Sequence, residues 1–410
     1  RDIQQNKING GPVMDREERY FQPDIECAEP EVLREIQSKR LREMAARCYD
    51  HVPFYRRKFD ELGIKPEDIR SIDDIVKLPF TYKTDLRDHF PYGLVAVPKE
   101  EVVRVHASSG TTGKQTVVAY TQHDIDVWAD GAARALAAAG CTKSDYVHVS
   151  YGYGLFTGGL GLHYGAEKLG ALCVPTGPGN TEKQLQMLVD MQSTVLCATS
   201  SYALLLAEEV KRRGLKDKIA LKRGIIGSER WGQKMRQRIA DELDIKIHDI
   251  YGLTEIYGPG ISIDCDYHCG LHYWDDYLYF EIIDPLTGEV LPEGELGELV
   301  ITTLRKEGAP LVRYRTRDLT RLIPGECPCG VKYPRHDVIL GRSDDMVKVK
   351  GVNIYPGQVD DMLKQVEGAS SEYQMVIELV NGKSELTLRV EREKGVDKAD
   401  LEQRIIRGFK

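Results

Sequence analysis

The sequence predicts an α/β protein with a large N-terminal domain and a small α+β C-terminal domain. Short apolar strands alternate with helical stretches between residues 146 and 250, which is typical of a layered fold with mostly parallel strands. From about Tyr277 the sequence turns to β-strands separated by Pro/Gly turns, and after Gly341 to a strand, a helix and a hairpin. We therefore expect domains at residues 1–343 and 344–410.

The individual elements follow from periodicity and capping residues. Residues 30–60 have helical spacing, which Val52–Tyr55 closes, and Thr121 with Asp124 forms a capping box for a helix that Gly140 ends. The expected strands are 102–106, 116–120, 146–150, 171–175, 195–198, 224–227, 245–250, 279–283, 298–303, 312–315, 346–350, 374–379 and 385–391. The remaining expected helices are 182–192, 202–213, 233–243, 357–366 and 397–410.

The composition excludes several protein classes. The 410 residues are 41% hydrophobic and 29% charged, as in an ordinary globular protein, and no apolar run approaches the ~18 residues of a membrane span. With 56 Lys and Arg against 64 Asp and Glu, the net charge of −8 argues against a nucleic-acid binder. The polar N-terminus lacks the apolar core of a signal peptide, and the nine cysteines are sparse and odd in number. We therefore expect a cytoplasmic protein.

A glycine-rich loop lies between two expected strands. It comprises Ser108, Ser109, Gly110, Thr111, Thr112, Gly113 and Lys114. Small residues let backbone N–H groups close around phosphate oxygens, and Lys114 adds a positive charge. A Walker A loop does not fit, because Gln115 stands where Mg²⁺ needs Ser or Thr and because a strand follows rather than a helix. A plain solvated turn is the alternative.

Four motifs in order resemble the adenylate-forming enzymes, the acyl-CoA synthetase and luciferase superfamily. They are SGTTGK at 109–114, YGLTE at 251–255, RYRTRD at 313–318 and GRSDDM at 341–346. Two narrower segments, YGYGLFTGG at 151–159 and VKGVNIYP at 349–356, resemble the phenylacetate–CoA ligase family. This resemblance covers almost the whole sequence. It implies an adenylate-forming N-terminal domain built of α/β sandwich subdomains and a β-rich part.

The resemblance implies ATP-dependent activation of an aryl-acetic acid, with phenylacetate the expected substrate, and transfer of the acyl group to coenzyme A. Loop residues 109–114 would hold the departing phosphates, and Thr254 would bind the α-phosphate. Glu255 would hold Mg²⁺, because this ion is commonly bound by a single carboxylate together with substrate oxygens. The nucleotide would also meet Ser228, Glu229, Asp249, Tyr251, Gly252, Asp318 and Arg342. Ser228 and Arg230 depart from the Ala and Pro that many relatives have around Glu229.

Simpler readings exist for these residues. Glu255 could be a surface carboxylate, and Asp318 between two arginines could be a plain ion pair. For the acyl group, the resemblance points to Tyr151 and Phe156 as pocket walls, although aromatic residues in such a segment also serve as core packing. No Arg or Lys lies within residues 151–161, which favours a monocarboxylic acid.

Two short segments contain four of the nine cysteines. Cys327 and Cys329 are one residue apart, and a distant Cys/His pair could complete a closed tetrahedral zinc site. The resemblance points to Cys265 and His272 as that pair, so we expect structural Zn²⁺. His268 and Cys269 are further candidates, and free thiols in a cytosolic loop are the alternative.

The resemblance places a hinge at Asp344 and brings Lys350 to the active site for thiol transfer. The family's adenylation lysine would lie beyond Lys410, so we expect the small domain to be incomplete at its end. Two rival functions are an adenylating module that loads a carrier protein and a zinc-stapled binding module without activity. Partners other than the small aryl acid are not indicated, apart from a second copy of the chain in a homodimer.

Overall fold

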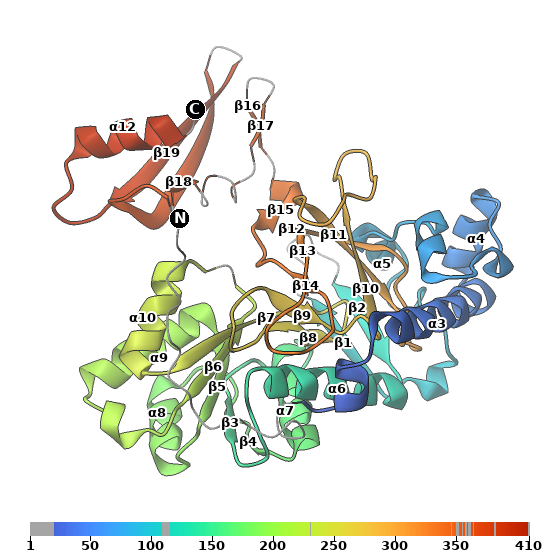
Figure 1. Cartoon of the computed structure of the whole chain (residues 1–410), viewed down its shortest axis with the longest axis horizontal. Coiled ribbons are helices and arrows are strands. Elements are labelled where there is room, and N and C mark those ends of the chain that lie inside the picture. The colour runs from blue at the N-terminus through green and yellow to red at the C-terminus, as the bar shows by residue number, and fades with distance from the viewer. Residues whose placement is uncertain are drawn as a thin grey trace.

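The computed structural model describes residues 20–108, 115–229, 231–345, 347–349, 352–354, 356, 359, 362–363, 365–380 and 383–408 (Figure 1). The helices are α2 (Pro23–Glu26), α3 (Pro30–His51), α4 (Pro53–Glu61), α5 (Lys83–Asp88), α6 (Gln122–Ala138), α7 (Gly158–Leu169), α8 (Thr181–Asp190), α9 (Ser200–Arg212), α10 (Gln233–Leu243) and α12 (Lys398–Gly408). Short 3-10 helices are η1 (Pro66–Asp68), η2 (Ile72–Lys77), η3 (Lys99–Glu101), η4 (Lys216–Lys218) and η5 (Ser343–Asp345).

The strands form one large sheet and several small ones. They are β1 (Arg104–Ser108), β2 (Thr116–Tyr120), β3 (Tyr146–Val149), β4 (Leu172–Val174), β5 (Val195–Thr199), β6 (Arg223–Gly227), β7 (Lys246–Leu253), β8 (Gly258–Asp264), β9 (Leu271–Tyr273), β10 (Leu278–Ile283), β11 (Gly297–Thr303), β12 (Tyr314–Thr320), β13 (Leu322–Ile323), β14 (Arg335–His336), β15 (Gly341–Arg342), β16 (Val347–Val349), β17 (Val352–Ile354), β18 (Ala369–Val380) and β19 (Lys383–Arg392).

The nine-stranded sheet has the order β13-β14-β9-β8-β7-β6-β5-β3-β4. Strands β4, β3, β5, β6 and β7 are parallel, and the pairings from β7 to β13 are antiparallel. The direction therefore changes at β7, where the chain reverses through a short turn into β8 instead of crossing over through a helix.

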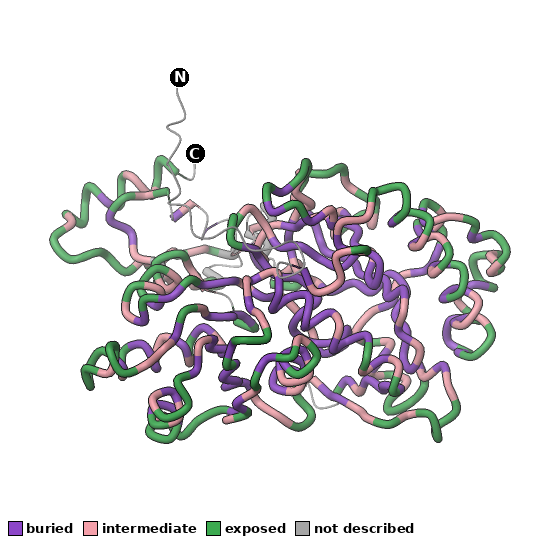
Figure 2. The backbone as a smooth tube through the Cα atoms, turned by 60° about the horizontal axis from the view of Figure 1, so that its bottom comes forward, coloured by how far each residue is buried: buried purple, intermediate pink, exposed green. Residues whose placement is uncertain are grey.

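Helices cover both faces of the parallel half, so most residues of the central strands β3, β5 and β6 are buried. On β5, Val195 and Cys197 join the core that includes α6 and α7, while Leu196 and Ala198 join a separate cluster with α8, α9 and α10. This division follows from the two-residue side-chain period of a strand. Figure 2 shows the buried backbone concentrated in the centre of the large domain.

A four-stranded antiparallel sheet, β10-β11-β12-β15, follows in the chain. Its pairing of β12 with β15 sets Asp318 opposite Arg342. Buried ion pairs stiffen this sheet: Arg313 Nη2 lies 2.8 Å from Glu281 Oε1, and Arg315 Nη2 lies 2.7 Å from Glu298 Oε2. The sheet therefore holds the Arg313–Asp318 motif rigidly.

Most sequence-predicted elements are confirmed, with boundaries shifted by a few residues. The capping box of Thr121 and Asp124 begins α6, and β18 pairs antiparallel with β19 on either side of the expected turn at Asn381-Gly382, which lies outside the described residues. Pro53, expected to close a helical segment, instead begins α4, because proline suits the first turn of a helix. Helix α7 was not expected, since glycines at its start have low helix propensity. The expected helix 357–366 lies largely outside the described residues.

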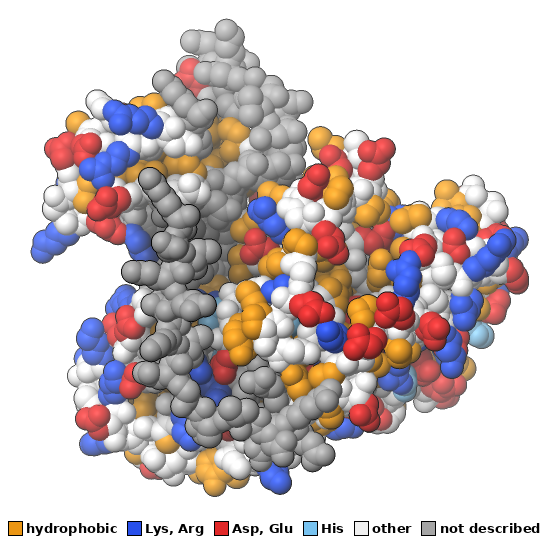
Figure 3. All heavy atoms as spheres, in the orientation of Figure 1, with side chains coloured by type: hydrophobic (Ala, Val, Ile, Leu, Met, Phe, Trp, Pro, Cys, Tyr) orange, Lys and Arg blue, Asp and Glu red, His pale blue; other side chains and the backbone are white. Residues whose placement is uncertain are grey.

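The C-terminal segment contacts the large domain through α10. Lys234 Nζ donates to Ala369 O at 2.9 Å and pairs with Glu393. In Figure 1, α12, β18 and β19 lie beyond the end of α10, and in Figure 3 basic and acidic side chains intermingle over the visible face. Among the described residues, no helix is long and apolar enough to cross a membrane.

Candidate active site

The site is built around the end of β7, where the parallel half of the sheet stops. Tyr251 and Gly252 lie in the last residues of this strand, and Thr254 and Glu255 lie in the turn to β8. Only glycine fits at position 252, because a Cβ there would lie 1.9 Å from the Gly258 carbonyl oxygen. The close approach of the two strands therefore fixes the turn that carries Glu255.

A chain of polar contacts joins three of the predicted motifs. Tyr251 Oη donates to Asp318 Oδ2 at 2.6 Å, and Arg342 Nη1 donates to Asp318 Oδ1 at 3.3 Å. The same guanidinium binds Asp344 through Nε at 2.8 Å and Nη2 at 2.9 Å. Burial raises the pKa of Asp318 to about 6, against the opposing effects of Tyr251 and Arg342. Asp318 is thus a partly buried acceptor, and Arg342 links it to the residue that we expect at the hinge.

Glu255 presents a buried carboxylate next to this chain. Its side chain is 5% exposed, and Lys83 Nζ, at the start of α5, lies 2.9 Å from Glu255 Oε1. The pKa of Tyr314, in β12, is raised by burial and by the nearby negative charges of Glu255 and Asp318. The structure therefore brings Glu255 and Asp318 to one site.

The turn at Thr254 and Glu255 is supported from the protein interior. Lys306, in the loop between β11 and β12, donates from Nζ to the Glu255 carbonyl at 3.2 Å. Tyr120 Oη lies 3.4 Å from the Thr254 carbonyl oxygen. Lys306 is completely buried, and this burial lowers its pKa to about 7.

Residues 109–114 of the glycine-rich loop, including Lys114, lie outside the described residues. The strands on either side are described: β1 and β2 pair antiparallel, with Ser108 opposite Thr116. The expectation that a strand rather than a helix follows the loop is confirmed. Among the described residues, neither Ser108 Oγ nor Thr116 Oγ1 has a hydrogen-bond partner.

The residues expected near adenine lie on β7 and directly after the neighbouring strand β6. The backbone N–H of Asp249, on β7, donates to Asp264 Oδ1 at 2.8 Å, and burial raises the pKa of the Asp249 carboxyl to about 7. Ser228 and Glu229 follow β6 and are exposed. Glu229 binds the N-terminus of α9, accepting from Ser201 N at 2.9 Å, where the helix dipole favours a carboxylate.

The aromatic segment after β3 forms a compact unit. Tyr151 is buried, while Phe156 is 40% exposed. A Cβ at Gly158 would lie 2.4 Å from Phe156 Cε1 and 3.1 Å from Tyr151 Cδ1, so both rings lie against that glycine. The Leu155 carbonyl ties the segment to β1, accepting from Ala107 N at 3.0 Å.

The cysteine cluster forms at the antiparallel end of the large sheet. Ligand atoms of Cys265, His272, Cys327 and Cys329 lie within 4.8 Å of one another, and all four residues are buried. Sγ of Cys265 lies 3.6 Å from Sγ of Cys327, near the separation of about 3.8 Å that Zn–S bonds of 2.3 Å give in a tetrahedron.

The imidazole of His272 is oriented for such a site. Its Nδ1 lies 3.2 Å from the Tyr333 carbonyl, so Nε2 faces the thiols, 3.3 Å from Cys329 Sγ. Of the further candidates, His268 binds Asp264 at 2.8 Å, and Cys269 lies 3.4 Å from Cys327 Sγ but outside the four-residue group. The four residues present therefore fit a closed zinc site.

Lys83, Tyr120 and Lys306 were missed by the sequence reasoning. Lys83 begins a short helix and Lys306 lies among charged and glycine residues, so both resemble surface lysines in the sequence. Tyr120 looks like an ordinary strand residue. No local pattern distinguishes them, because their roles depend on contacts between distant segments.

Comparison with known proteins agrees with this geometry. The family model for AMP-binding enzymes matches residues 38–304, and the model for the C-terminal domain of AMP-binding enzymes matches 351–410. A phenylacetate–coenzyme A ligase of Pseudomonas putida is 51% identical over 360 residues, covering 87% of this chain and 81% of that protein. The Escherichia coli K12 ligase is 48% identical, with 90% and 84% covered. The chain belongs to the phenylacetate–CoA ligase family of AMP-binding enzymes.

Solved structures of a related ligase allow the overall arrangement of this chain to be compared with different states of that enzyme. An open form of 2-hydroxyisobutyryl-CoA ligase, with 2-HIB-AMP and CoA, has a TM-score of 0.83 at 29% identity, covering 99% of this chain and 95% of that one. The thioesterification form has a TM-score of 0.76 at 30% identity, covering 99% and 88%. The overall arrangement of this chain is therefore more similar to the open form, and to a postadenylation form with a TM-score of 0.84 at 28% identity, than to the thioesterification form. The predicted superfamily and fold class are confirmed.

Proposed function

We propose that this enzyme activates phenylacetate with ATP and transfers the acyl group to coenzyme A. The observation that carries the proposal is its identity of 48–51% to four phenylacetate–coenzyme A ligases. In the first step, a carboxylate oxygen of the acid attacks the α-phosphorus of ATP, and pyrophosphate leaves. In the second, the CoA thiol, losing its proton, attacks the acyl carbon and AMP leaves.

Positive charge and hydrogen-bond donors stabilise the first step, because negative charge builds on the departing pyrophosphate. Glu255 would hold Mg²⁺, which supplies positive charge to the phosphates when bound. Lys83 Nζ, 2.9 Å from Glu255 Oε1, adds a cation at the same place. Ser108, loop residues 109–114 and Thr254 would bind phosphate oxygens.

Asp318 would accept hydrogen bonds from the ribose hydroxyls, and Arg342 would contact the same sugar or the phosphate. This role agrees with the partly buried position of Asp318 and with its two donors, Tyr251 and Arg342. Tyr251, Gly252, Asp249, Ser228 and Glu229 would line the adenine side. Glu229 would act there by ordering the N-terminus of α9, to which its carboxylate is bound.

Tyr151 and Phe156 would form walls of the aryl pocket. Both rings lie against Gly158, whose missing side chain leaves the space that the Phe156 ring occupies. The substrate would be held by apolar burial, with its carboxylate directed to the nucleotide.

Cys265, His272, Cys327 and Cys329 would hold a structural Zn²⁺, closing the loop between β13 and β14 onto β8 and β9. We further propose a hinge at Asp344 between domains 1–343 and 344–410, with Lys350 acting in thiol transfer. A cytoplasmic location is supported by nine cysteines, none of them in a disulfide. The homodimer stays an expectation without support from a contact.

Loading of a carrier protein is less favoured. Three carrier-dependent peptide synthetases match at 22–35% identity, and the matches cover only 4–7% of those proteins. The full-length ligases match at far higher identity over most of their length.

Pyrophosphate exchange with a panel of acids tests the function. Phenylacetate should support exchange better than benzoate, indole-3-acetate or 2-hydroxyisobutyrate, and CoA should be acylated only when ATP is present. Absence of exchange with every aryl acid would contradict the activity. Exchange without CoA acylation, but with acylation of a carrier protein, would favour the rival function.

A further inference from the structure

Lys306 is a lysine with no exposed surface next to the proposed Mg²⁺ residue. A buried ammonium loses its hydration, which is costly unless the protein replaces it. The replacements are the Glu255 carbonyl oxygen at 3.2 Å and two aromatic rings, with Nζ 4.3 Å from the Tyr120 centroid and 5.2 Å from that of Tyr257.

The loop that carries Lys306 is itself fixed by one carboxylate. Asp124 Oδ1 accepts from Glu307 N at 2.7 Å, and Asp124 Oδ2 accepts from Gly308 N at 2.8 Å and Thr121 N at 3.0 Å. A Cβ at Gly308 would lie 2.7 Å from Asp124 Oδ2, so this approach requires glycine. The N-terminus of α6 therefore sets the position of the Lys306 backbone.

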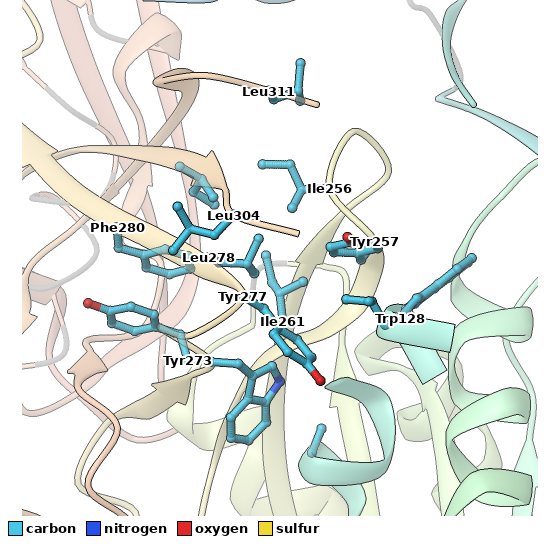
Figure 4. Close-up of a cluster of buried hydrophobic side chains, with 14 of the residues drawn as sticks. Trp128, Ile256, Tyr257, Ile261, Tyr273, Tyr277, Leu278, Phe280, Leu304 and Leu311 are labelled. Carbon is cyan, nitrogen blue, oxygen red and sulfur yellow. The ribbon is translucent and has the colours of Figure 1, made fainter. Parts of the chain in front are cut away.

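Lys306 and Tyr120 act on consecutive carbonyl groups of one turn. Tyr120 Oη lies 3.4 Å from the Thr254 carbonyl oxygen, and Lys306 binds the next carbonyl, that of Glu255. Figure 4 shows Ile256 and Tyr257, the two residues that follow Glu255, among the buried hydrophobic side chains of the core. The turn is held from its interior side by segments far away in the sequence.

Two lysines hold Glu255 in different ways. Lys83 meets the carboxylate, and its side chain is 38% exposed. Lys306 meets only the backbone carbonyl and is sealed from solvent, so it cannot touch a phosphate. The inner lysine controls where the Glu255 backbone lies, and hence where its carboxylate points.

We propose that Lys306 is a positioning residue for adenylation, fixing the Thr254–Glu255 turn so that the Glu255 carboxylate faces the metal and the phosphates. The inference rests on the proposed function, since Glu255 is its Mg²⁺ ligand. Tyr120 assists through the neighbouring carbonyl.

The test compares the two half-reactions in Lys306→Met, which keeps the length and apolar stem of the side chain. Adenylation is followed by phenylacetate-dependent pyrophosphate exchange over a range of Mg²⁺ concentrations. Thioester formation is followed from synthetic phenylacetyl-adenylate at saturation with CoA. We expect exchange to fall about tenfold or more, with a higher half-saturating Mg²⁺ concentration, and thioester formation to change less than about twofold.

The matched control is Lys39→Met, whose side chain is 71% exposed; it should leave both half-reactions unchanged. Wild-type exchange is measured alongside, so that failure of the proposed function is seen separately from failure of this inference. Equal losses in the two half-reactions, or no loss in exchange, would overturn the proposal. If Lys306→Met does not fold, Tyr120→Phe decides by the same criteria, because it removes one hydroxyl and keeps the ring beside Lys306.

Discussion

Replacing Asp318 by Asn should stabilise the ligand-free enzyme at alkaline pH. The carboxyl has an ordinary pKa of 3.8 and a pKa of about 6 in the fold, chiefly because burial disfavours its charge. Its ionisation therefore costs the folded state about 3 kcal/mol above pH 6. The raised pKa already includes the attraction of Arg342, so removing the charge is expected to stabilise the folded state by about 3 kcal/mol, or about 3–4 °C in Tm for a chain of this length.

The pH dependence gives the sign of the effect. A carboxyl with a raised pKa holds its proton more tightly in the folded state, so the wild type loses stability relative to Asp318→Asn as pH rises from 4 through 6. Thermal unfolding of both proteins at pH 8 and pH 5, at one scan rate, checks this. The variant should be more stable than the wild type at pH 8, and the difference should shrink to about half of that value at pH 5. A variant less stable than wild type at pH 8, or a pH-independent difference, would refute the reasoning.

Three further outcomes are expected. Glu255→Gln should slow pyrophosphate exchange by about a hundredfold or more, because the negative charge is lost. The control Glu295→Gln, at an exposed position, should not slow it. Equal exchange rates for the two variants would contradict the metal-binding role of Glu255. Gly158→Ala should displace the Phe156 ring and raise the KM for phenylacetate about tenfold, with little change in the KM for ATP. An unchanged KM for phenylacetate would show that this ring does not line the pocket. Metal analysis should find about one zinc per chain, and Cys327→Ser should lower both zinc content and Tm; a metal-free wild type would contradict the site.

Much of the fold was predictable because its strands and helices are locally encoded. The apolar strands between Tyr146 and Ile250 and the capping box at Thr121 carry their structure in short windows. The direction change at β7 was not predictable, since parallel and antiparallel neighbours give the same apolar pattern. Helix α7 was missed because packing of its glycines against Trp128 and Ala132 outweighs their low propensity.

The same distinction applies to the site. Glu255 and Asp318 lie in motifs, and resemblance identified them, as it identified the cysteine cluster. Sequence alone could not show that Tyr251 binds Asp318, or that Glu229 is bound to the start of α9. Lys306 was beyond reach, since its burial depends on an acid nearly two hundred residues away, Asp124.

The hairpin at β7 and β8 has a consequence for protein engineering. The carbonyl groups of its turn accept hydrogen bonds from the side chains of Tyr120 and Lys306. Its two strands also approach so closely at position 252 that only glycine fits there. A graft of residues 246–264 onto another scaffold would carry the Glu255 motif but leave its carbonyls without these donors. The smallest transferable unit is therefore not a contiguous motif but three segments together: the hairpin, strand β2 with the first turn of α6, and the loop at 304–308.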